Sequence, residues 1–324
     1  MNKNWTRIRR QGATKLVGAT LRTFSGLARR LPTSHPKRHN VEVLRDIPYL
    51  PSGQKEHTLD IYRPSGDVKG APVVFYAHGG AFQTLSKKTH WLMGLAFAKQ
   101  GYLVCNINYR LAPRYPYPAA MIDVCAACSW LVEHIHEYGG DSSKLILSGE
   151  SAGANLVTAL TLAVCYERTE AWARKLWDVH PQIRAVIPAC GLLQVSDTQR
   201  FARRKKLPIW MADHIASISE AYLPYTLEVS IDFPLADPLL LLEGGKHPQR
   251  PLPPFFIPVG TKDPILDDSR RLKTALDRLG ASSELRYYEG GVHAFHALLW
   301  QPIARQCWQE QFNFCRKQLA TTND

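Results

Sequence analysis

The sequence predicts an α/β protein with a mostly parallel sheet flanked by helices. Two observations carry this prediction. Between residues 72 and 189, short apolar runs of strand length alternate with longer runs of helical length, which is the pattern of right-handed βαβ crossovers. The 324 residues contain 45% hydrophobic side chains, enough for a large buried sheet, and no internal repeat or long low-complexity linker divides them.

A glycine-rich loop follows the first apolar strand of this pattern. The strand is predicted at residues 72–77, and His78-Gly79-Gly80-Ala81 comes directly after it. Backbone N–H groups of such a loop can be aimed at an oxyanion that forms during acyl transfer. We interpret His78 as a structural residue that orients the loop, rather than as a proton carrier.

A G-x-S-x-G motif at residues 149–153 lies where a strand turns into a helix. Residues 144–148 form a short apolar strand pattern, and residues 152–166 form an uncharged helix pattern. Glycine is needed on both sides of the serine because the backbone there is strained and the flanking chains pass too close for side chains. The motif predicts Ser151 as a nucleophile. We interpret the neighbouring Glu150 as a hydrogen-bond partner within the scaffold, rather than as a second acid.

Two later strands place an acid and a base at the same edge of the sheet. An apolar strand at residues 255–259 leads to Asp263, and a strand at residues 283–288 leads to a loop that holds His293. Folds of this class carry functional groups at the carboxyl ends of their strands. Ser151, Asp263 and His293 are therefore predicted to form a catalytic triad.

The three residue types fit the roles that a triad requires. Serine is a poor nucleophile until a base removes its proton, and histidine is the base that works near neutral pH. We expect Asp263 to hold the His293 imidazole in one tautomer and to stabilise the imidazolium. The N–H of Ala152 is expected to bind the oxyanion, together with N–H groups of the glycine loop.

Other acids and bases lie close to the predicted triad positions. Asp267 and Asp268 precede a helix pattern and suit its first turn, where carboxylates face the positive end of the helix dipole. His296 competes with His293 as the base, and we interpret it as a wall or surface residue.

Five segments in order resemble the hormone-sensitive-lipase family of α/β-hydrolases, in its bacterial esterase branch. The segments are HGGAF (78–82), YRLAPRYPYPAA (109–120), GESAGAN (149–155), GTKDPILDD (260–268) and GGVHAF (290–295). Two positions depart from the family pattern. The family usually carries Asp or Thr where Glu150 stands, and many members have glycine where Ala81 stands.

The resemblance implies the α/β-hydrolase fold, with an eight-stranded, mostly parallel sheet and a helical cap. It implies that Gly80 and Ala81 join Ala152 as oxyanion donors, with Gly79 shaping the turn. The implied activity is that of a serine carboxylesterase for short- to medium-chain carboxylic esters, without a metal or a cofactor. An amidase or deacetylase with the same triad stays open. A non-catalytic receptor is disfavoured because all three triad residues are present.

The predicted division of the chain has four parts. A basic N-terminal cap segment covers residues 1–45, the core covers residues 46–190 and 246–324, and a helical cap insertion covers residues 191–245. We expect the apolar and aromatic residues of the insertion to cover the nucleophile and form a substrate pocket. The alternative is a surface excursion without substrate contact.

The positive charge is concentrated in the first forty residues. This arm holds ten of the 40 Lys and Arg residues and no Asp or Glu, which leaves only +2 of the net charge of +12 for the remainder. A basic amphipathic helix suits an anionic membrane surface, and it equally suits a cap helix with its apolar face on the core. We favour the cap helix, and nucleic-acid binding is not expected because no recognition motif accompanies the charge. Between residues 13 and 28 the apolar positions fall roughly on one helical face: Leu16, Val17, Leu21, Phe24 and Leu27.

The cysteine pattern indicates reduced, mostly buried thiols, because seven scattered cysteines come without a secretion-signal pattern. Cys125 and Cys128 have C-x-x-C spacing but lie in a helix pattern, and no second pair completes a zinc site. We expect a small-molecule ester as the partner, no nucleic acid, and a cytoplasmic location. Peripheral membrane contact, an organellar transit peptide and the oligomeric state, a dimer included, are left open.

Overall fold

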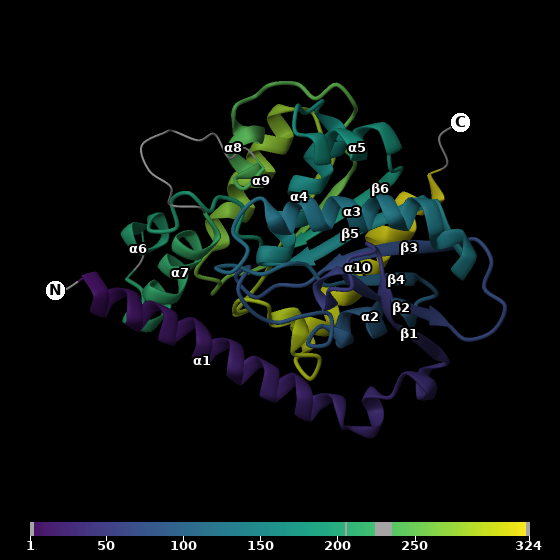
Figure 1. The fold of residues 1–324 in the computed structure, drawn as a ribbon, viewed down its shortest axis with the longest axis horizontal. Coiled ribbons are helices and arrows are strands. Elements are labelled where there is room, and N and C mark those ends of the chain that lie inside the picture. Colours follow the sequence, from purple (N-terminus) through teal and green to yellow (C-terminus); the bar gives the residue numbers. More distant parts are fainter. Residues whose placement is uncertain (1–2, 205, 224–234, 322–324) are drawn as a thin grey trace.

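The computed structural model describes residues 3–204, 206–223 and 235–321. Its centre is an eight-stranded sheet in the order β1-β2-β4-β3-β5-β6-β7-β8 (Figure 1). The pairs β1/β2 and β2/β4 are antiparallel, and the pairs from β4 to β8 are parallel, which confirms the predicted fold class. The strands are β1 Val41–Pro48, β2 Thr58–Pro64, β3 Ala71–Ala77, β4 Leu103–Ile107, β5 Gly140–Glu150, β6 Ile183–Ala189, β7 Phe255–Gly260 and β8 Ser283–Tyr288.

Helices cover both faces of this sheet. Side chains alternate between the faces along each strand, so Val73 and Phe75 pack in one apolar layer while Val74 and Tyr76 pack in the other. The first layer is closed by α3 Ala119–His134, α4 Ala152–Cys165, α5 Ala171–Val179, α8 Pro238–Glu243 and α9 Leu266–Arg278. The second layer is closed by α2 Trp91–Ala98 and α10 Pro302–Ala320.

Residues 191–245, the predicted insertion, contribute α6 Arg200–Arg204 and α7 Ile209–Tyr222 besides α8; residues 205 and 224–234 lie outside the described part of the chain. Buried carboxylates hold the start of this segment. Asp268 accepts hydrogen bonds from the N–H groups of Leu193 (2.8 Å) and Gln194 (3.2 Å), and its Oδ1 lies 2.6 Å from Nη2 of Arg200. Asp268 lies in the first turn of α9, as expected from the sequence, but its fully buried side chain also ties the segment to α9, which the sequence does not predict.

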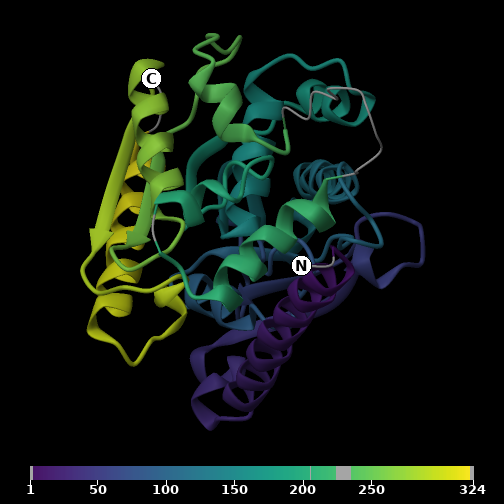
Figure 2. The ribbon, with the colours of Figure 1, turned by 90° about the vertical axis from the view of Figure 1, so that its left-hand side faces the viewer.

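The N-terminal helix α1 (Lys3–Arg29) runs along the lower side of the molecule in Figure 1 and crosses α7. Among the α1 residues whose burial the structure describes, Thr14 and Gly18 are the buried ones. Thr14 Oγ1 lies 2.6 Å from Ser217 Oγ of α7, and a Cβ added at Gly18 would lie 2.4 Å from Thr84 Oγ1. These two small residues thus face the rest of the protein, along which α1 runs in Figure 2.

The expectation that the apolar face of this helix packs on the core is wrong. Leu16, Leu21, Phe24 and Leu27 are between 45% and 70% exposed. The close approach to α7 and Thr84 needs small side chains, and the large apolar residues lie at other angles around the helix.

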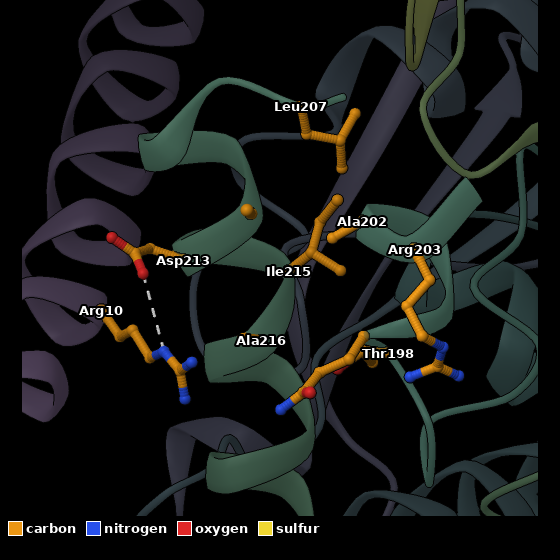
Figure 3. Close-up of a pocket in the computed structure, with 10 residues that line it drawn as sticks. Arg10, Thr198, Ala202, Arg203, Leu207, Asp213, Ile215 and Ala216 are labelled. Carbon is orange, nitrogen blue, oxygen red and sulfur yellow. Dashed lines mark ion pairs between the residues drawn. The ribbon is translucent and has the colours of Figure 1, made fainter. Parts of the chain in front are cut away.

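A small cavity of about 290 Å³ lies between α1, α6 and α7. Figure 3 shows Arg10 of α1 paired with Asp213 of α7 on one side of it, and Arg203 and Leu207 also line it. None of the predicted triad residues lines this cavity.

Candidate active site

Ser151 occupies a strained turn between β5 and α4. Its backbone has φ 53° and ψ −114°, a conformation that costs a non-glycine residue about 1–3 kcal/mol. The Ser151 N–H donates to the Ala189 carbonyl at the end of β6 (2.9 Å), which fixes the turn to the neighbouring strand. The serine is thus presented at the carboxyl edge of the sheet, as the motif predicts.

Steric crowding explains why glycine stands at positions 149 and 153, on the two sides of Ser151. A Cβ at Gly153 would lie 2.1 Å from the Ala77 carbonyl oxygen, and a Cβ at Gly149 would lie 2.5 Å from the Gly153 carbonyl oxygen. No side chain fits at either distance, because real Cβ atoms do not approach a backbone oxygen so closely. The backbone segments beside the Ser151 turn therefore pass as close to one another as the sequence predicts.

Asp263 and His293 lie together beyond the ends of β7 and β8. Asp263 is 4% exposed; its Oδ1 accepts a hydrogen bond from the Ile265 N–H (2.9 Å), and its Oδ2 accepts one from His293 Nδ1 (2.8 Å). The His293 side chain keeps 34% exposure, so its other ring nitrogen is free to face a substrate. Burial alone would lower the pKa of His293, but the facing Asp263 carboxylate raises it above its usual value.

No hydrogen bond joins the Ser151 hydroxyl to His293 among the contacts of the described residues. Such bonds are often long in ligand-free enzymes and shorten when substrate binds. Cys190, the residue after β6, lies beside the Asp263–His293 pair, with the ligand atoms of all three within 4.8 Å of one another. Burial raises the pKa of the Cys190 thiol. The hydrogen bond from His293 to Asp263 is the one that a catalytic triad requires.

The glycine loop after β3 has three consecutive residues with positive φ: Gly80 (114°), Ala81 (58°) and Phe82 (58°). A Cβ at Gly80 would lie 2.1 Å from the Thr84 carbonyl oxygen, so only glycine fits there. The Gly79 N–H points to His90 Nε2 (3.4 Å). The N–H groups of Gly80, Ala81 and Ala152 make no hydrogen bond to a described residue, which leaves them available for an oxyanion.

His78 supports this loop. Its Nδ1 donates to the Gly79 carbonyl (2.7 Å), and its ring stacks on Tyr109 with centroids 4.3 Å apart. The Tyr109 hydroxyl in turn donates to the His78 carbonyl (2.7 Å). Burial lowers the pKa of His78 to about 3, so the imidazole is neutral in the working range and carries no proton between substrate groups. These contacts agree with the structural role expected from the sequence.

Glu150 lies between two buried histidines. His90 Nε2 is 2.9 Å from Glu150 Oε1, and His296 Nε2 is 3.0 Å from Glu150 Oε2. Burial by itself would raise the pKa of Glu150, but the two facing imidazoles hold it well below its usual value. The interpretation of Glu150 as a scaffold partner agrees with these contacts. The interpretation of His296 as a wall or surface residue is wrong, because it is 3% exposed and bound to Glu150.

His90 is a residue that sequence reasoning missed. It precedes α2, outside every motif, and reaches the site only because α2 packs on the sheet beside the glycine loop. His214, on α7, also lies outside every motif and was missed. Burial, followed by the charge of His293, lowers the pKa of His214 to about 4.

The helix α7 lies over the glycine loop. The rings of Phe82 and Tyr222 stack with centroids 3.8 Å apart, and Gln83 Nε2 donates to the Ser217 carbonyl (3.4 Å). On another side, a groove of about 970 Å³ reaches His293 and Glu150 from between α1, α2 and α10. The candidate site therefore has both a cover and an open apolar approach.

Comparison with known proteins places this geometry in a family. The profile of a family described by the alpha/beta hydrolase fold matches residues 74–297, more than half of the chain. The chain belongs to this family. Esterase LipI of Mycobacterium tuberculosis is 30% identical over 264 residues, which cover 81% of this chain and 76% of that protein. Carboxylesterase NlhH of the same organism is 30% identical, over 75% of this chain and 72% of its own length.

Solved structures agree with the fold. Bacterial heroin esterase superposes with a TM-score of 0.75 at 20% identity, covering 93% of this chain and 90% of that one. Esterase B of Lactobacillus rhamnosis, solved with a tributyrin phosphonate inhibitor, superposes with a TM-score of 0.76 at 20% identity, covering 99% and 97%. The predicted resemblance to a family of esterases, and the prediction of a hydrolase, are thereby confirmed.

Proposed function

We propose that this chain is a serine carboxylesterase in which Ser151, Asp263 and His293 form the catalytic triad. The observation that carries the proposal is a serine at a strained strand–helix turn, with a buried Asp–His pair at the same edge of the sheet. The esterase names of the relatives support the same reaction.

The reaction begins when Ser151 Oγ attacks the ester carbonyl and His293 takes the hydroxyl proton. His293 then gives this proton to the leaving alcohol, which produces an acyl-enzyme. A water molecule, deprotonated by the same imidazole, hydrolyses the acyl-enzyme and regenerates the serine. Asp263 keeps the Nδ1–H tautomer in place and stabilises the imidazolium without taking a proton.

The negative charge of the tetrahedral intermediate falls on the former carbonyl oxygen. We assign its stabilisation to the N–H groups of Gly80, Ala81 and Ala152, which have no other acceptor among the described residues. Gly79 shapes the loop and is held by His90. Each donor aimed at the developing charge contributes about 3 kcal/mol to lowering the barrier.

The proposed substrates are short- to medium-chain carboxylic esters. Relatives include acetyl esterases of Salmonella, and the inhibitor bound to the Lactobacillus enzyme is a tributyrin phosphonate. An amidase or deacetylase would use the same triad, so amide substrates are the second candidate. The proposed division into an N-terminal cap segment (1–45), a core and a cap insertion (191–245) accords with the contacts between α1 and α7.

A cytoplasmic location is also proposed, since all seven cysteines are free and buried, as expected where thiols are kept reduced.

The test is hydrolysis of p-nitrophenyl esters from acetate to laurate by the wild type and by Ser151→Ala. We expect the variant to keep its fold by circular dichroism and to lose kcat by about six orders of magnitude, because no other nucleophile replaces the serine. Ser269→Ala is the matched control, a buried serine on α9 whose loss should leave turnover unchanged. Esterase activity that persists in Ser151→Ala would exclude the assigned nucleophile.

A further inference from the structure

The helix α1 presents a row of large apolar side chains to solvent. Trp5 and Leu16 are each 70% exposed, Leu27 is 58% exposed and Phe24 is 51% exposed. Trp5, Leu16 and Leu27 recur every eleven residues, about three turns, and therefore lie on one face. Several large apolar side chains exposed along one side of a helix suit binding to a protein or a membrane. We call these four residues the apolar face of α1.

Positive charge borders this face. Arg9 and Arg10 are engaged with α7, through Asp213 and Glu220. Six further cations of this arm have side chains that the structure describes, and none of them has an ion-pair partner within the described residues: Lys15, Arg22, Arg29, Arg30, Lys37 and Arg38. Arg22 donates a hydrogen bond to Thr84 Oγ1 (2.6 Å), and residues 1–40 contain no acid that could neutralise these charges. Apolar side chains beside unneutralised cations are the combination that binds the interface of an anionic bilayer.

The large groove opens beside the apolar face. Leu21, Phe24 and Leu31 form its wall on the side of α1, and Trp308 and Phe312 of α10 lie on the opposite side. Its volume of about 970 Å³ is near the top of the range of roughly 300–1,000 Å³ for small-molecule sites. The inner end of the groove reaches His293.

The mouth of the groove is itself apolar. Phe24 and Trp300 meet edge to face with centroids 6.0 Å apart, and Trp300 is 61% exposed. Leu31, 54% exposed, lies on the same rim. An alkyl chain that leaves a bilayer at this rim would remain in contact with apolar side chains up to the catalytic histidine.

We propose that the apolar face of α1 rests on an anionic lipid bilayer and that the groove receives the alkyl portion of a lipid ester from that bilayer. The second half rests on the proposed esterase function, whereas the docking does not. Thr14 contacts Ser217 of α7 and Gly18 packs against Thr84, and both lie on a different face of the helix from Trp5, Leu16 and Leu27. Docking therefore leaves these two contacts in place. No helix within the described residues is long and apolar enough to cross a bilayer, so the contact is peripheral.

A second copy of this chain fits the same face less well. Pairing two such faces would bring two acid-free, strongly basic arms together, and like charges across an interface repel. An anionic lipid surface instead supplies the opposite charge over the whole arm. The positive charge of the arm therefore favours an anionic bilayer over a second copy of the chain.

The docking test is cosedimentation of the full-length protein with vesicles of phosphatidylcholine, and with vesicles that also contain anionic phosphatidylglycerol. We expect binding to the anionic vesicles that weakens with added salt. Trp5→Ser/Leu16→Ser should weaken it by more than about tenfold, since each side chain loses the gain of leaving water. Lys15→Gln/Arg30→Gln should weaken it by about thirtyfold.

Leu240→Ser/Tyr287→Ser is the matched control, because it removes two exposed apolar side chains from α8 and β8 instead. It should bind the anionic vesicles like the wild type. Equal binding by the Trp5/Leu16 variant and the wild type would overturn the docking. So would a stable dimer in solution that fails to bind vesicles, because it would assign the apolar face to a second copy.

The groove test compares p-nitrophenyl laurate with p-nitrophenyl acetate. Ala96→Phe places a ring in the groove from α2 and should lower the laurate-to-acetate ratio of kcat/KM by about tenfold or more. Ala171→Phe, at an exposed position on α5, is the control and should leave the ratio unchanged. An unchanged ratio in Ala96→Phe would overturn the groove assignment. No hydrolysis of either ester by the wild type would instead refute the esterase function, while vesicle binding would still decide the docking.

Discussion

At the scale of single residues, Glu150 connects three segments of the candidate site. It precedes the proposed nucleophile, accepts a hydrogen bond from Nε2 of His90, and lies 3.0 Å from Nε2 of His296, three residues after the proposed base. The His90 ring in turn lies beside the Gly79 N–H (3.4 Å). An ionised carboxylate in this position is stable because two imidazoles face it. We therefore expect Glu150 to position the loops that carry the proposed oxyanion donors and the proposed base.

Glu150→Gln should lower kcat by roughly tenfold to a hundredfold while KM changes little, because the donors and His293 lose their fixed positions. The free energy of unfolding should fall by about 3 kcal/mol, as for other broken buried pairs. Steady-state kinetics and urea unfolding would measure both. Glu137→Gln is the matched control, since it breaks an exposed pair with His134. Unchanged kcat together with lower stability would reduce Glu150 to a purely structural role.

We expect the pKa of His293 to set the pH dependence of ester hydrolysis. The Asp263 carboxylate raises this pKa above the usual value of about 6.5, and the protonated imidazole cannot act as a base. The value of kcat/KM should therefore fall as pH drops through a midpoint above about 6.5. Asp263→Asn should move the midpoint down and lower kcat by about 10⁴-fold. A profile whose midpoint stays in place in Asp263→Asn would contradict the pairing.

At the scale of elements, a buried ion pair holds the start of the insertion on the core. Asp268→Asn leaves the Arg200 guanidinium buried without its carboxylate, which should cost about 3–5 kcal/mol. Arg200→Met/Asp268→Asn should recover much of this loss, because both charges are then absent. Thermal unfolding of both variants would show it. A double variant as unstable as Asp268→Asn would mean that the backbone N–H bonds of Leu193 and Gln194 dominate instead.

The elements also show why some sequence predictions succeeded. The strand at β5, the turn at Ser151 and the helix α4 follow one another within 26 residues, and their glycines and apolar runs are local signals. The position of Asp268 in the first turn of α9 was predicted, but its bonds to the insertion were not, because a first-turn carboxylate needs no such partner. Only the packing of α9 against residues 193–200 turns it inward.

At the scale of the whole molecule, α1 presents different residues on two faces. Thr14 contacts α7 and Gly18 packs against Thr84, whereas Trp5, Leu16 and Leu27 are exposed. Cap helix and membrane contact were alternatives at the level of the sequence. The tertiary structure makes them compatible, because they use different sides of one helix.

Deletion of residues 1–30 should therefore alter both properties. Tm should fall by about 5 °C, because α7 loses Thr14 and Arg9. Hydrolysis of p-nitrophenyl acetate should also fall without any lipid, because α7 covers the glycine loop. A chain that begins at residue 9 keeps Arg9 and Thr14 and serves as the control. Unchanged Tm and rate in the longer deletion would show that α1 is not part of the cover.

The sequence by itself determined the fold class, the family and the proposed residues Ser151, Asp263 and His293. It could do so because each lies in a short motif at the carboxyl end of a strand, and the parallel sheet brings those ends to one edge. Only the tertiary structure decided that His90 and His296 meet at Glu150 and which face of α1 is buried. Those outcomes depend on packing between segments far apart in the chain. The local sequence allows several partners for Glu150 and several buried faces for α1, and only the fit of the packed side chains decides between them.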